Sequence, residues 1–77
     1  MKAMKLADVP QGGAATVEEV ACSPRERSRL APLGIVQGVG VEVLRNVNRG
    51  AVLVEVRNTL VAMSRAVAEG IVVKGER

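Results

Sequence analysis

The sequence contains no histidine, phenylalanine, tyrosine or tryptophan, and its only cysteine is Cys22. Without histidine or clustered cysteines, the chain lacks the ligands from which zinc, haem and iron-sulfur sites are usually built. Without aromatic rings, it also lacks the stacking platforms of typical single-strand and RNA-binding modules. A single cysteine can form no disulfide within the chain, which is typical of a protein kept in a reducing cytoplasm. We therefore expect no cofactor and no metal site.

Long apolar runs are also missing. No stretch approaches 18 consecutive apolar residues, and Met1 to Lys5 leads into Leu6-Ala7-Asp8 rather than into an apolar signal segment. We expect a cytoplasmic protein that does not insert into a membrane. With 77 residues the chain fits one small domain, 1–77, whose ends at 1–4 and 74–77 are expected to fray. Whether Met1 or Met4 is the true start stays open.

The residue types needed for catalysis do not come together. Cys22 has no histidine to act as its base, and the serines have none either, so neither a thiol nor a serine nucleophile is activated. The glutamates fall on separate predicted elements with no repeated spacing. The glycine-rich segment 34–40 has no lysine-serine or lysine-threonine ending and follows a helix instead of leading into one. We expect a protein that is not an enzyme.

Alternating valines predict a mainly β protein. The turn signal Pro10 to Gly13 is followed by a predicted strand, Ala14 to Val20. Glu18-Glu19 interrupts its alternation, which indicates a bulge or an early end of the strand. Valine then occupies every second position from 39 to 43 and from 52 to 56, which indicates a hairpin with one face buried. Residues 60–63 and 71–73 complete a set of about five short strands. So short a chain buries both strand edges best by curling into a small barrel.

One short helix is predicted over about residues 24–33. Ser23, Pro24 and Glu26 form a capping box, and Pro32 with Gly34 ends the helix. Leu30 and Leu33 share a face that is expected to lie on the core, at one end of the barrel. A helical turn is predicted near 65–69, capped by Ser64 and ended by Gly70.

Binding is the activity left to such a domain. The off-phase strand residues Leu44, Leu53 and Val61 are expected to present apolar side chains to a partner. Eleven Lys and Arg against eight Asp and Glu give a net charge of +3, so the arginines could instead converge into a patch for acidic loops or phosphates. Scatter around the barrel is the simpler arrangement for them, and self-association through spare valines is also open.

The order of these features resembles the FeoA family, the ferrous iron transport protein A of bacteria. Leu6 to Val9 with Gly12 is similar to the opening of the family. Arg29-Leu30 followed by Leu33-Gly34-Ile35 and Gly38 resembles its most recognisable stretch. The valine pairs and the closing segment, Leu60 to Val73, complete a likeness over nearly the whole chain.

The resemblance implies an SH3-like β-barrel and an accessory role in Fe(II) uptake, in which the domain binds and modulates the cytoplasmic GTPase region of the FeoB permease. At the level of the family it also implies an association with transition metal ions. The expected contact residues are Arg29, Leu30, Leu33, Gly34, Leu44, Leu53 and Val61. The alternative is a small basic SH3-like module that binds nucleic acid or regulates another protein, although contact with nucleic acid is not expected without aromatic residues.

Overall fold

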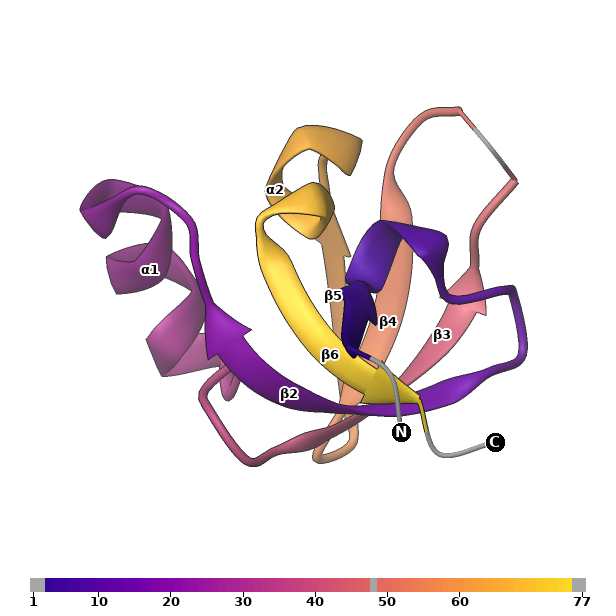
Figure 1. Ribbon diagram of the computed structural model, residues 1–77, viewed down its shortest axis with the longest axis horizontal. Coiled ribbons are helices and arrows are strands. Elements are labelled where there is room, and N and C mark those ends of the chain that lie inside the picture. The colour runs from indigo at the N-terminus through magenta and orange to yellow at the C-terminus, as the bar shows by residue number, and fades with distance from the viewer. Residues whose placement is uncertain (1–2, 48, 76–77) are drawn as a thin grey trace.

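The computed structural model describes residues 3–47 and 49–75. Six antiparallel strands form one curled sheet, which confirms the mainly β fold (Figure 1). In chain order the elements are β1 (Ala3–Lys5), the 3-10 turn η1 (Leu6–Asp8), β2 (Ala14–Val20), α1 (Pro24–Leu30), the 3-10 turn η2 (Ala31–Leu33), β3 (Gly40–Arg45), β4 (Val52–Val56), β5 (Thr59–Met63), α2 (Arg65–Glu69) and β6 (Ile71–Gly75). Strand β1 was not expected from the sequence.

The structure differs from the expected fraying at both ends of the chain. Ala3 and Met4 pair with Lys74 and Val73, and β6 continues to Gly75. Three residues with mixed side chains carry too little alternation to indicate a strand, and tertiary pairing with β6 makes β1 one. Residues 1–2 and 76–77 lie outside the described part of the chain.

The strands are ordered β1-β6-β2-β3-β4-β5 across the sheet. Strands β2 and β6 run side by side along the molecule (Figure 1), and their pairing shifts register between Val17 and Glu19. This shift confirms the bulge predicted at Glu18-Glu19. The expectation that curling removes both bare edges is wrong, because β1 and β5 each have only one neighbouring strand in the described sheet.

The inward faces of the strands form the core, as the alternation predicts. Each of the valines at 39, 41 and 43 and at 52, 54 and 56 is buried. Direct pairing of Val43 with Val54 puts the two runs on the same face of the sheet. Apolar residues from outside the strands close this core: Leu6, Leu30, Ile35 and Ala68.

Helix α1 begins where its sequence predicts, at Pro24, but it ends at Leu30, and the 3-10 turn η2 covers the rest of the predicted helix to Leu33. The backbone N–H of Glu26 donates to Ser23 Oγ at 3.3 Å, and Pro24 occupies the first turn. Pro32 lies in η2 rather than in the α-helix, and Gly34 ends the segment with a φ of +96°. Helix α1 lies beyond the end of β2, at one side of the molecule (Figure 1). No helix in the described ranges is long and apolar enough to cross a membrane.

Candidate functional site

Four of the predicted contact residues line one groove. Arg29, Leu30 and Leu33 reach it from α1 and η2, and Val61 reaches it from β5. The groove has a volume of about 310 Å³. Its remaining lining residues are Glu26, Ala62, Met63, Ser64 and Val67. We call it the α1–β5 groove.

The helix side of the groove is shaped by the way α1 ends. Leu30 turns inward and is buried, whereas Leu33 leaves 43% of its surface exposed. The expectation that both leucines pack on the core is therefore wrong for Leu33. Leu33 is the last residue of η2, which has no buried residue, and the chain changes direction directly after it at Gly34.

The other side of the groove is strand β5 and the start of α2. Val61 and Met63 point inward and are buried, and Val67 packs against the core at its rim. The Ser64 hydroxyl accepts a hydrogen bond from Val67 N–H at 3.2 Å, which fixes the step from strand to helix. The wall therefore consists of four consecutive residues, 61 to 64, followed by one turn of α2.

The outward position of β5 belongs to Leu60 and not to Val61. Val61 is 4% exposed and Leu60 is 64% exposed. Val61 lies directly opposite Val54, which faces the core, so it must face the core as well. The sequence hid this phase because β5 is apolar at most positions. A two-residue turn at Arg57-Asn58 makes Thr59 the partner of Val56. Counting on from this pair places Val61 opposite Val54, on the core face, and would have identified the phase of β5.

The other predicted contact residues lie elsewhere. Leu44 and Leu53 are half-buried on the outer face of β3 and β4 and do not line the groove. Gly34 follows Leu33 closely, and a Cβ added to it would lie 3.7 Å from Val56. Gly34 therefore shapes the chain behind the groove and offers no side chain to a partner.

Two charged residues line the groove, Arg29 and Glu26. The Arg29 side chain is 72% exposed, and its Nη1 lies 4.0 Å from Glu26 Oε1. A solvent-exposed pair at this distance holds its members weakly. Arg29 is therefore free to turn toward an acidic group of a partner, while Ala62, Met63 and Leu33 supply an uncharged surface beside it.

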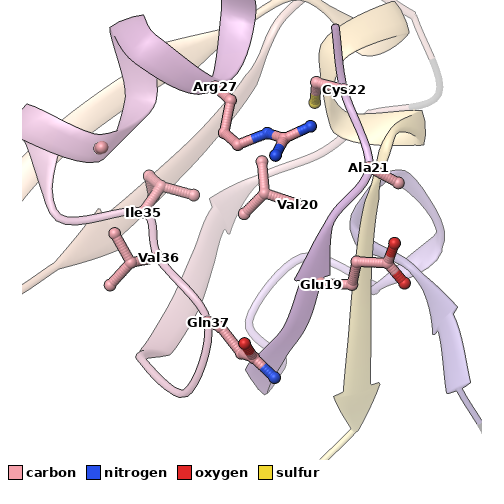
Figure 2. A pocket seen from close by; sticks show the side chains of 9 residues that line it. Glu19, Val20, Ala21, Cys22, Arg27, Ile35, Val36 and Gln37 are labelled. Carbon is pink, nitrogen blue, oxygen red and sulfur yellow. The ribbon is translucent and has the colours of Figure 1, made fainter. Parts of the chain in front are cut away.

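A second hollow lies on the opposite side of α1, between that helix and the end of β2. Its volume is about 540 Å³. Figure 2 shows the Arg27 side chain reaching over Val20, with Ile35 on one side of it and Cys22 on the other. Glu19, Ala21, Ala31, Val36 and Gln37 complete its lining. None of the predicted contact residues opens into it.

Cys22 lies at the wall of this second hollow as a protonated thiol. Its Sγ donates to the carbonyl of Val67 at 3.6 Å. Burial raises the pKa of Cys22, Glu26 raises it further, and Arg27 opposes them. A thiol with a raised pKa is a poor nucleophile at neutral pH, so the geometry gives Cys22 a packing role.

The arginines do not converge into one patch. Arg65 points inward and donates from Nη2 to Asn46 Oδ1 at 2.8 Å. Asn46 in turn donates from Nδ2 to the carbonyls of Ala7 and Val9 at 2.9 and 2.8 Å. This network joins α2 to η1 and to the segment after β3. Sequence reasoning missed Asn46, which reads as a simple turn residue.

No group of three or more His, Cys, Asp and Glu side chains that could hold a metal ion occurs in residues 3–47 and 49–75. The prediction that the glutamates fall on separate elements is wrong for Glu18 and Glu19, which are both in β2, and Glu42 of β3 lies directly opposite Glu55 of β4.

Comparison with known proteins agrees with the fold and the sequence motifs. The solution structure of a FeoA protein from Chlorobium tepidum is 37% identical, has a TM-score of 0.89, and is matched over 96% of this chain and 71% of that one. FeoA from Stenotrophomonas maltophilia, determined with zinc and described as an SH3 domain protein, is 30% identical over 96% of both chains with a TM-score of 0.83. A manganese-dependent transcriptional repressor, 23% identical with a TM-score of 0.85, shares the fold over 95% of this chain and 41% of its own length. No curated protein matches.

These relatives confirm the SH3-like β-barrel that the resemblance implied. The sequence profile of the FeoA domain matches residues 4–75, which include the groove and every strand except the first residue of β1. The chain therefore belongs to the FeoA domain family.

Proposed function

We propose that this protein is a non-enzymatic accessory component of bacterial ferrous iron uptake. It acts in the cytoplasm by binding the GTPase region of a FeoB-type Fe(II) permease and modulating it. The α1–β5 groove is the contact surface. Leu33, Ala62 and Met63 supply the apolar contact, and Arg29 supplies a charge for an acidic group of the permease.

The observation that carries this proposal is the meeting of the family's arginine-leucine motif with β5 in one groove. Three of the residues by which the sequence resembles the family, Arg29, Leu30 and Leu33, are among the residues that line it. Its apolar surface is partly exposed at Leu33, beside a cation that is weakly held. The S. maltophilia relative has been described as a candidate activating factor of ferrous iron transport, which agrees with such a role.

The second reading, a basic module for nucleic acid, has less support. Arg25, Arg27 and Arg29 lie on α1, while Arg65 is held inside by Asn46. Cations spread over separate elements do not form the continuous basic track that phosphate binding requires. Its test is the affinity for DNA or RNA measured at several salt concentrations. A nucleic-acid module would lose affinity steeply as salt rises, whereas we expect negligible binding by this protein at moderate salt.

Isothermal titration calorimetry with the GTPase region of the matching permease tests the proposal. We expect the wild-type protein to bind, and we expect Leu33→Asp to weaken the association at least tenfold because a carboxylate replaces apolar contact area. Val36→Asp is the matched control. Val36 is 40% exposed, carries the same change in charge, and opens into the second hollow.

Binding of Val36→Asp should equal that of the wild-type protein. Absence of heat for the wild-type protein at high concentration, in the GTP-bound, GDP-bound and nucleotide-free states, would refute the proposed partnership. Equal weakening by both variants would move the contact surface away from the α1–β5 groove.

A further inference from the structure

The two edges of the sheet are protected very differently. Strand β1 has three residues, Ala3–Lys5, and ends on a lysine. Strand β5 has five residues, Thr59 to Met63, with no charged side chain, proline or bulge. Natural proteins shield an edge by shortness, charge, proline or a bulge, because an open edge pairs with other strands. Edge β5 has none of these devices.

The main-chain groups on the free side of β5 can be assigned from its turn. Arg57 and Asn58 have φ values of +51° and +65°, which form the type I′ turn of a two-residue hairpin. Such a turn makes Val56 and Thr59 a hydrogen-bonded pair, and the bonded positions alternate from there. Thr59, Val61 and Met63 therefore bond to β4, while the N–H and C=O groups of Leu60 and Ala62 point away from the sheet.

Of the two residues with outward groups, Ala62 lines the α1–β5 groove, and Leu60 lies on the strand just before its lining begins. Four consecutive residues of the chain, 61 to 64, line it, so its wall includes inward and outward positions of the strand and the main chain between them. No hydrogen bond joins α1 or η2 to β5 within residues 3–47 and 49–75. The groove thus offers an unpaired strand edge opposite two leucines.

We propose that the permease contacts this protein by adding a strand to β5. The inference rests on the proposed function and specifies its binding mode: an extended segment of the GTPase region pairs with the main chain of Leu60 and Ala62. One apolar side chain of that segment lies against Leu30 and Leu33. Strand addition of this kind takes its affinity from main-chain hydrogen bonds and its specificity from pockets for alternate side chains.

Charge selects the occupant. Arg29 is the one arginine among the groove's lining residues, its side chain is 72% exposed and only weakly paired with Glu26, and β5 itself has no charged residue. Arg57 lies in the turn that begins β5. An extended segment with an acidic residue near Arg29 complements these cations. The strand β5 of a second copy has no acidic side chain to pair with Arg29, so we assign the edge to an acidic partner segment and not to self-pairing.

Amide hydrogen exchange, followed by NMR on the full chain with and without the GTPase region, tests this mode. In the free protein we expect rapid exchange at Leu60 and Ala62, and slow exchange at Val61 and Met63, which bond to β4. Binding should slow exchange at Leu60 and Ala62 at least tenfold and leave Val61 unchanged.

A pair of variants at one position gives an independent readout. Ala62→Pro removes an outward N–H that β4 does not use, and proline is tolerated at such edge positions. We expect it to fold and to bind the GTPase region about tenfold more weakly, which corresponds to one lost hydrogen bond of about 1.4 kcal/mol. Ala62→Val keeps the N–H and measures the effect of a larger side chain at the same position, so Ala62→Pro should weaken binding more than Ala62→Val does, and equal weakening by the two variants would refute strand addition.

The outcomes separate this inference from the function on which it rests. If the GTPase region does not bind the wild-type chain at all, the proposed function fails and the binding mode fails with it. If it binds while Leu60 and Ala62 continue to exchange rapidly, the partnership stands and strand addition is refuted. If both amides are protected in the free protein and sedimentation shows a dimer, a second copy occupies the edge and the inference is wrong. Should Ala62→Pro fail to fold, the exchange measurement on the wild-type chain still decides.

Discussion

Replacing Asn46 by alanine should destabilise the domain more than any other surface amide substitution. The Asn46 side chain donates two hydrogen bonds, to the carbonyls of Ala7 and Val9, and accepts one from the Arg65 guanidinium. Two neutral bonds at about 1 kcal/mol each and one charged bond at about 1.5–3 kcal/mol give an upper sum of about 5 kcal/mol. Because the three bonds share one side chain and water can reach part of the site, we expect a loss of about 3 kcal/mol.

That loss is a large share of the stability of so small a domain. Small proteins have about 0.05–0.15 kcal/mol of unfolding free energy per residue. A loss of about 3 kcal/mol at about 4–8 °C per kcal/mol lowers Tm by about 12 °C or more. Arg65 adds to the cost, because its Nε is already buried without a hydrogen-bond partner in the described structure, and the substitution removes the acceptor of Nη2 as well.

Urea and thermal unfolding followed by circular dichroism measure the effect. Gln37→Ala is the control, since Gln37 is exposed and lies outside this network, and it should change the unfolding free energy by less than about 0.5 kcal/mol. In a double-mutant cycle, Asn46→Ala and Arg65→Ala should couple by at least about 1 kcal/mol. A loss below about 1 kcal/mol for Asn46→Ala would refute the reasoning.

Three further predictions concern turns and packing. Asn58→Val places a β-branched residue at a φ of +65° and should cost about 1–2 kcal/mol in urea unfolding; an unchanged midpoint would contradict the turn geometry. A Cβ at Gly70 would lie 3.1 Å from Cys22 Sγ. Gly70→Ala should therefore destabilise the wild-type chain more than it destabilises a chain that carries Cys22→Ala. Equal losses of unfolding free energy in the two backgrounds would refute that contact. Burial, and then Glu26, raise the pKa of Cys22, so the folded chain keeps its thiol proton to higher pH than the unfolded chain. Iodoacetamide should therefore label the folded protein more slowly than the unfolded protein at about pH 8. The free energy of unfolding should decline as pH rises through the folded pKa of this thiol. Labelling at the unfolded rate would contradict the burial.

The parts of the fold that follow from local patterns were predictable. Valine at every second position fixes which faces of β3 and β4 are buried, because strand periodicity leaves no other arrangement. Ser23 and Pro24 identify the start of α1 because capping depends on residues only three apart. Features decided by distant contacts were not predictable. Strand β1 exists because β6 pairs with it, and Asn46 matters because of carbonyls more than 30 residues away in the chain.

The candidate site shows the same division. A contiguous motif predicted Arg29 and Leu30 as contact residues, and both line the α1–β5 groove. Val61 was assigned to the wrong face because β5 has apolar residues at alternate and intervening positions, so periodicity alone cannot give its phase. Leu60, the most exposed of the large apolar residues in the described structure, was missed for the same reason.

The most direct test of the central claim is an NMR titration of the isotopically labelled protein with the GTPase region of its permease. If the α1–β5 groove is the contact surface, amide signals of Leu30, Leu33 and residues 61–64 should shift or broaden, while those of Val20 and Gln37 at the second hollow stay in place. Shifts confined to the second hollow, or a spectrum that does not change at saturating partner, would contradict the account.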